Sequence, residues 1–100
     1  MFRHVVMFRW SDASTTEQRA AAVAALRDFA VDVADLGVVA VGPDAGLAEG
    51  NFHCVVIAEF ADQAGYLAYA ADPRHTRLLT DHIRPIVGTR TAVQSSFSSE

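Results

Sequence analysis

Two segments of this 100-residue sequence carry apolar side chains at both odd and even positions, and that pattern constrains the fold most. They are FRHVVMFRW (2–10) and NFHCVVIAEF (51–60). Successive side chains of a strand point to opposite faces of a sheet, so both faces of these two strands need cover. In the first segment Val5 and Met7 share one face, and the other carries Phe2, His4, Val6, Phe8 and Trp10.

Segments with helical spacing follow each of these strands. The stretch SDASTTEQ (11–18) contains a capping box, Ser14 or Thr15 followed by Glu17 or Gln18, and the helix should run to about residue 34. Asp62 should cap a second helix that runs to about residue 71. Asp72-Pro73 then breaks it, because proline removes a backbone donor and disfavours helical geometry in the residue before it. A further helical segment should follow, until Pro85 and Gly88 stop it.

A short strand is expected at 36–42, and a fourth strand at 89–97. The order strand, helix, strand, strand, helix, strand is a repeated split βαβ unit, and it predicts one domain over residues 1–100. The class is α+β, ferredoxin-like, with a four-stranded antiparallel sheet and both helices on one face. The second face would then expose a large apolar surface, which predicts a homodimer of two sheets packed face to face. We assign Val6, Phe8 and one face of FHCVVIAEF (52–60) to that interface, with either a packed core or a lined pocket between the sheets.

Charge and cysteine content exclude several classes of partner. The formal net charge is −4, and the eight basic residues, all arginine, are scattered along the chain. Without a basic patch, a nucleic-acid partner is not expected. No apolar run approaches the roughly 20 residues that a membrane span needs, and the N-terminal residues lack a signal-peptide pattern. Cys54 is the single cysteine and is expected to be a core thiol, so the chain cannot form an internal disulfide. We therefore expect a protein of the reducing cytoplasm, without membrane partners.

The stretch YAADPRH (69–75) contains the residues best suited to chemistry. The turn at Pro73 should let Tyr69 and His75 line one cavity, with His4 added from the first strand. A neutral imidazole can take a proton from an acidified carbon, and a phenol can donate a hydrogen bond to the resulting enolate. In the alternative arrangement the tyrosine packs between helices and the histidine caps a helix or faces solvent.

No cofactor or metal is expected at this site. His75 and His82 lie seven residues apart and lack a third ligand, so their spacing matches no zinc pattern. Proton transfer of the kind described needs only positioning and the exclusion of water.

The chain resembles the stress-responsive dimeric A/B barrel (Dabb) family over about residues 2–97. The resemblance is carried by HVVMFRW, by EF before the second helix and by DPRHTRLL, and it implies a dimeric α+β barrel. The chain is also partly similar to the olivetolic acid cyclase-type members of the family, which use a tyrosine and a histidine in the motif Tyr-x-x-His-Pro-x-His. Tyr69 and His75 match that motif, and Asp72 replaces its first histidine.

His4 matches the histidine that opens the first strand in the family. The histidine that the family often has in its third strand falls on Cys54 when the residues are counted back from Phe60, and His53 lies one residue away. A slip of one residue sends a strand side chain to the opposite face unless a bulge corrects it. The roles of His53, Cys54 and His82 are therefore left open.

Three functions remain, and whether the protein is an enzyme is left open. The first is a homodimer whose barrel cavity binds a small apolar or polyketide-like molecule. The resemblance to the family implies that such a protein has a role in the stress response. The alternative is a cofactor-independent polyketide cyclase or lyase, in which His75, Tyr69 and His4 are catalytic and Val6 and Phe8 line the cavity. The third is a cofactor-free monooxygenase or a haem-handling protein.

Overall fold

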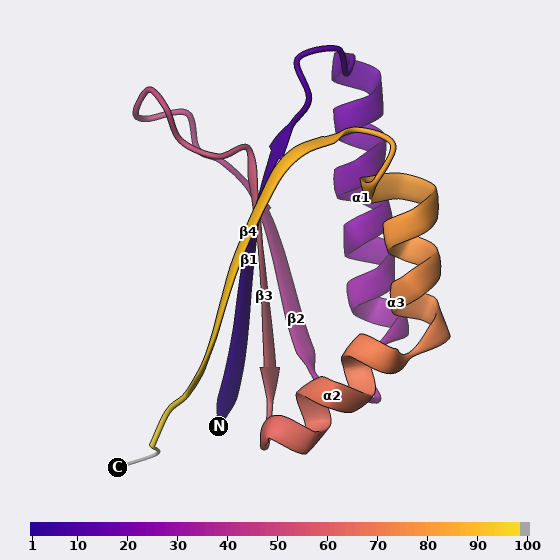
Figure 1. Ribbon diagram of the computed structural model, residues 1–100, viewed down its shortest axis with the longest axis vertical. Helices are drawn as coiled ribbons and strands as arrows, with labels where there is room; N and C mark the ends of the chain where they lie inside the picture. The colour runs from indigo at the N-terminus through magenta and orange to yellow at the C-terminus, as the bar shows by residue number, and fades with distance from the viewer. Residues whose placement is uncertain (99–100) are drawn as a thin grey trace.

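The computed structural model describes residues 1–98, which form an antiparallel sheet with helices on one face (Figure 1). The strands are β1 (Phe2–Trp10), β2 (Val38–Pro43), β3 (Cys54–Phe60) and β4 (Val87–Ser96). The helices are α1 (Thr16–Asp32), α2 (Gln63–Ala71) and α3 (Pro73–Leu78), and the last continues into a π-helical turn, η1 (Leu79–Ile83). The four-stranded sheet has the order β2-β3-β1-β4, so the predicted ferredoxin-like arrangement is confirmed.

The first helix begins at the predicted capping box. The Thr15 hydroxyl accepts a hydrogen bond from the Gln18 amide at 3.1 Å, and the Gln18 side chain accepts one from the Thr15 amide at 2.8 Å. Ser14 has a different role, because its hydroxyl donates to the Ser11 carbonyl. Helical spacing then places a stripe of buried side chains against the sheet, namely Ala22, Leu26, Phe29 and Val33.

The predicted break at Asp72-Pro73 is also confirmed. Asp72 is extended, with φ −67° and ψ 135°, so α2 ends there and Pro73 begins α3. The Asp72 carboxylate accepts the Arg74 backbone N–H at 2.8 Å and pairs with the Arg74 side chain at 2.9 Å. Arg74 also pairs with Asp35 at 3.0 Å and donates to the Asp32 carbonyl at 2.6 Å. The break between α2 and α3 is thereby tied to the end of α1.

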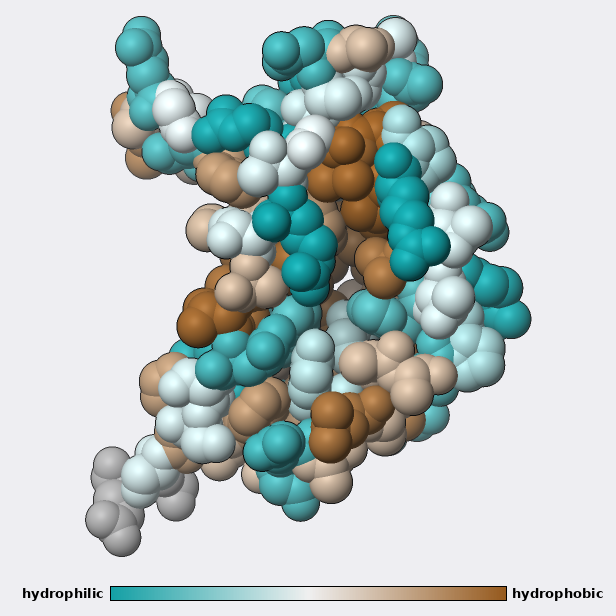
Figure 2. Space-filling view, viewed as in Figure 1, coloured by the Kyte–Doolittle hydropathy of each residue, from teal (hydrophilic) through white to brown (hydrophobic). Residues whose placement is uncertain are grey.

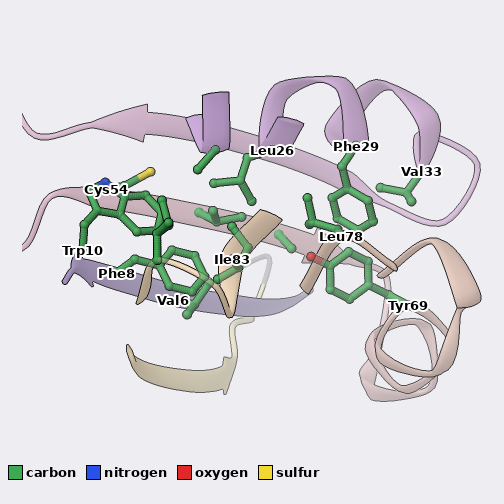
Figure 3. Packing of buried hydrophobic residues seen from close by; sticks show 14 of the residues in the cluster. Val6, Phe8, Trp10, Leu26, Phe29, Val33, Cys54, Tyr69, Leu78 and Ile83 are labelled. Atoms are coloured by element: carbon green, nitrogen blue, oxygen red, sulfur yellow. The ribbon is translucent and has the colours of Figure 1, made fainter. Parts of the chain in front are cut away.

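The prediction that Val6 and Phe8 lie on the uncovered face of the sheet was wrong. Within one chain Val6 is 5% exposed and Phe8 is 2% exposed, and both belong to the core between the sheet and its own helices (Figure 3). The alternation along β1 was predicted correctly, but the helices cover the opposite face to the one assigned. The even-numbered residues of β1 therefore point to the helices.

The helix-free face carries the odd-numbered residues of β1 and their cross-strand partners. Val5 pairs with Ile57 and Val93, and Met7 pairs with Val55. Met7 is 38% exposed and Val93 is 63% exposed. The middle of this face is therefore apolar and is left uncovered by the chain's own helices.

The helices of residues 1–98 include none with the length and apolar character that a membrane span requires.

Candidate active site

A small cavity lies between the helices and the sheet of a single chain, and not in the space between two sheets, for which the sequence left either a packed core or a pocket open. Its volume is about 30 Å³, so it has room for little more than a water-sized group. Figure 2 shows the surface hollowed between β4 and α3, with hydrophilic residues on either side of hydrophobic ones. The apolar lining comes from Val6, Phe8, Leu26, Val56, Leu78 and Leu79, and the polar lining from His4, Tyr69, His75 and Arg90.

Tyr69 reaches the cavity from the last turn of α2. Its side chain is 3% exposed, and its ring lies 5.1 Å from the Phe60 ring and 4.9 Å from the His75 ring, centre to centre. In Figure 3 its hydroxyl points inward, toward Leu78 and Ile83. Burial, with a smaller contribution from Tyr66, raises the pKa of Tyr69 to about 12. The phenol is therefore protonated at neutral pH and can donate a hydrogen bond inside the cavity.

His75 lies in the first turn of α3, directly beyond the break. Its half-buried ring packs against Tyr69 and also against Phe29, whose ring centre is 5.9 Å away. Burial lowers the pKa of His75 and the positive charge of Arg90 lowers it further, while a backbone hydrogen bond at Ala70 and the Asp72 carboxylate oppose this shift. Because the net shift is downward, the imidazole is mostly neutral at pH 7 and can accept a proton.

His4 contributes a third ring, from β1. It is 3% exposed, and its Nδ1 lies 2.7 Å from the side-chain nitrogen of Gln94. Because an amide nitrogen can only donate, Nδ1 accepts this bond and the ring proton lies on Nε2. Burial lowers the pKa of His4 to about 4, with smaller contributions from the charges of Arg90 and His75. His4 is thus a neutral imidazole, held in one tautomer.

Neither Arg90 nor Gln94 was predicted from the sequence to lie at the site. In the pairing of β1 with β4, Arg90 lies opposite Phe8 and Gln94 lies opposite His4. Directly opposed residues share a face of the sheet, so both side chains project to the helix-covered side. The alternation in TRTAVQ (89–94) was the available signal, but its use required knowing that the last strand pairs with the first.

The remaining candidate residues lie outside the cavity. His53 accepts a hydrogen bond from the Trp10 backbone N–H at 2.8 Å and lines a separate, open groove of about 630 Å³ along α1. Cys54 is buried in β3, where burial raises the pKa of its thiol, and His82 lies on the exposed side of η1. Within residues 1–98 no group of three histidine, cysteine or acidic side chains could hold a metal ion.

Comparisons with known proteins agree with this architecture. The family model Dabb, described as the stress responsive A/B barrel domain, matches residues 2–97. A dimeric ferredoxin-like protein of unknown function from Thermobifida fusca is 34% identical, with a TM-score of 0.85 over 96% of this chain and 90% of that one. Comparison with curated proteins finds no match.

Two more distant solved structures are proteins whose names state an activity. Hydroxynitrile lyase from Passiflora edulis is 15% identical, with a TM-score of 0.79 over 99% of this chain and 94% of that one. An antibiotic biosynthesis monooxygenase is 17% identical, with a TM-score of 0.76 over 98% of this chain and 99% of that one. At these identities the likeness shows a shared fold and no more.

Proposed function

This chain belongs to the stress-responsive A/B barrel domain family, and we propose that its cavity is an acid–base site of the lyase or cyclase kind for a small carbonyl compound. One observation carries the proposal. The neutral imidazole ring of His75 and the buried, protonated phenol ring of Tyr69 line the wall of one cavity, with their ring centres 4.9 Å apart. Perturbed ionisable groups gathered in a cavity are typical of catalytic sites.

The proposed reaction begins with a proton transfer from carbon. Neutral His75 takes a proton from a carbon next to a carbonyl group, and the bonding electron pair moves onto the carbonyl oxygen. The Tyr69 hydroxyl donates a hydrogen bond to this enolate oxygen, and the Nε2–H of His4 can supply another. The enolate carbon then attacks a second carbonyl, and His75 returns the proton to the new alkoxide. A lyase would run the same steps in reverse.

The resemblance to cyclase-type members supports this chemistry at two positions. Tyr69 and His75 match their tyrosine and last histidine, whereas Asp72 replaces their first histidine. Here Asp72 serves the turn, because its carboxylate binds Arg74. The small volume of the cavity favours a substrate that places only its reacting group inside. A larger polyketide would require Leu78 or Leu79 to move.

Deuterium exchange at the α-carbons of 2-butanone, followed by proton NMR in D₂O, tests the acid–base proposal. The unmodified protein should exceed the buffer rate, and His75→Ala should lose about a hundredfold or more of that excess, because the base is gone. His82→Ala is the matched control, since His82 lies outside the cavity, and it should exchange at the unmodified rate. A His75→Ala protein that is folded and fully active would contradict the proposal, and one that unfolds would assign His75 to the structure.

A second candidate is ligand binding without chemistry. The observation that favours it is the tight packing around the cavity, where the rings of Phe29, Phe60 and His75 all contact Tyr69. Binding of a ketone that shifts the histidine NMR signals, with exchange at the buffer rate, would select this candidate. The monooxygenase alternative has only the shared fold behind it, and a cavity of about 30 Å³ gives no support to a haem-handling role.

We also propose that the chain is a homodimer. The T. fusca protein, 34% identical, is described as dimeric. The helix-free face offers the surface for such a dimer, because its centre is apolar and lacks cover from the chain's own helices.

A further inference from the structure

The charge around the cavity has one sign. Of the four polar groups that line it, the two imidazoles and the phenol are neutral at pH 7, and Arg90 carries a permanent positive charge. None of the lining residues is an aspartate or a glutamate. The whole chain has a formal net charge of −4, so the positive charge at the cavity is opposite in sign to the net charge of the chain.

Arg90 has no carboxylate partner among residues 1–98, in contrast to the arginine that ties the helices together. Arg74 binds Asp35, Asp72 and a backbone carbonyl, so its guanidinium is used by the fold. Arg90 stands on the edge strand β4, is exposed at the cavity wall, and projects to the helix-covered side because it lies opposite Phe8. It is close enough for its charge to lower the pKa of both His4 and His75.

We propose that Arg90 anchors the carboxylate of a short keto acid, whose ketone group enters the cavity beside His75 and Tyr69. This inference rests on the proposed function, since it names the substrate class of the same site. A guanidinium presents parallel N–H donors that match both oxygens of a carboxylate. The cavity admits only a small group, so the charged end of the ligand stays at the solvent side with Arg90 while the ketone end is enclosed.

Anion binding at this position would also favour the chemistry. The charge of Arg90 lowers the pKa of His75 in the free protein. A carboxylate paired with the guanidinium offsets that charge, so His75 becomes a stronger base once the substrate is bound. A neutral ligand brings no charge to offset that of Arg90.

The test compares levulinate (4-oxopentanoate) with its methyl ester, which keeps the ketone and removes the charge. Isotope-labelled protein is titrated with each at constant ionic strength, and the imidazole signals of His4 and His75 are followed by NMR. Levulinate should bind at least about tenfold more tightly than the ester and should move both signals. Equal affinities for the two compounds would overturn the proposal.

Two variants locate the effect. Arg90→Gln should bind levulinate and the ester equally, whereas Arg84→Gln, an exposed arginine outside the cavity, should keep the preference of the unmodified protein. Levulinate that still binds preferentially to Arg90→Gln would mean that the anion is held elsewhere, and the proposal would fail. If Arg90→Gln does not fold, Arg90→Lys keeps the charge without the planar fork, and a full preference for levulinate in that variant would likewise exclude bidentate anchoring.

The binding measurement is independent of turnover. If the protein prefers levulinate through Arg90 but does not exchange the α-hydrogens of ketones, the anion site is supported and the acid–base function is contradicted. If the protein exchanges these hydrogens through His75 but does not prefer levulinate, the acid–base function is supported and the anion site is contradicted.

Discussion

At the scale of single residues, sequence reasoning predicted which three side chains share a cavity, namely His4, Tyr69 and His75, and could not supply their charge states. The motif YAADPRH indicated Tyr69 and His75, and strand alternation placed His4 on the face with Val6 and Phe8. The pKa values are set by burial and by Arg90, and both depend on which elements pack together. Arg90 itself was missed because its face depends on a strand pairing across most of the chain.

The buried state of His4 predicts a loss of stability in mild acid. Its pKa is about 4 in the folded chain and about 6.5 when unfolded, so between these values the unfolded chain binds more protons. The contribution is fully present above pH 6.5 and is lost as the pH falls toward 4. Across this window His4 takes up a proton in the unfolded chain and not in the folded one. This difference alone should reduce the free energy of unfolding by on the order of 3 kcal/mol.

Denaturant unfolding at several pH values checks this expectation. His4→Gln should flatten the dependence between pH 6.5 and 4, because the titrating group is gone. His82→Gln, an exposed histidine, should leave it unchanged. A slope that survives His4→Gln would assign the effect to other groups, such as His75.

At the scale of elements, the helix break was predicted and its support was not. The sequence showed that Pro73 must interrupt the helix. The ion pair of Arg74 with Asp35 joins residues 39 positions apart in the sequence, and a local pattern does not reveal such a contact. The π-helical turn η1, which brings Leu79 to the cavity wall, was predicted as ordinary helix because its residues carry no distinguishing spacing.

Arg74 should act as a positioning residue for His75. Arg74→Gln removes the tie to the end of α1, so the first turn of α3 should exchange its backbone hydrogens faster and the His75-dependent rate should fall severalfold. Arg77→Gln is the control, because that exposed arginine lies one turn further along and makes none of these bonds. Hydrogen exchange of the His75 region is the measurement that separates positioning from global stability. Unchanged exchange in the Arg74→Gln protein would contradict the role.

At the scale of the whole molecule, the sequence predicted the ferredoxin-like order and a sheet that needs cover on both faces. Its assignment of the two faces was wrong, because it placed Val6 and Phe8 on the face without helices. Both faces of β1 and β3 are apolar, so alternation separates the two sets of residues without deciding their places. This explains why Val6 and Phe8 line the intrachain cavity, while Val5 and Met7 lie on the uncovered side.

The corrected face gives the last prediction, which concerns the homodimer. Met7 lies near the centre of the helix-free face, between Val55 and Thr91 on the neighbouring strands. Met7→Asp would place an unpaired charge in an apolar interface, so light scattering should show a folded monomer at concentrations where the unmodified protein is a dimer. Leu67→Asp, an exposed leucine on α2, should remain dimeric.

Because the cavity is lined by one chain, separation of the dimer should leave ligand binding in place. Monomeric Met7→Asp should still prefer levulinate over its methyl ester, since His4, Tyr69, His75 and Arg90 all belong to the same chain. Loss of that preference in a folded monomer would mean that the partner supplies part of the site or holds β4 in position. An unmodified protein that is monomeric at micromolar concentration would instead contradict the dimer itself, and the apolar centre of the helix-free face would then need another kind of cover.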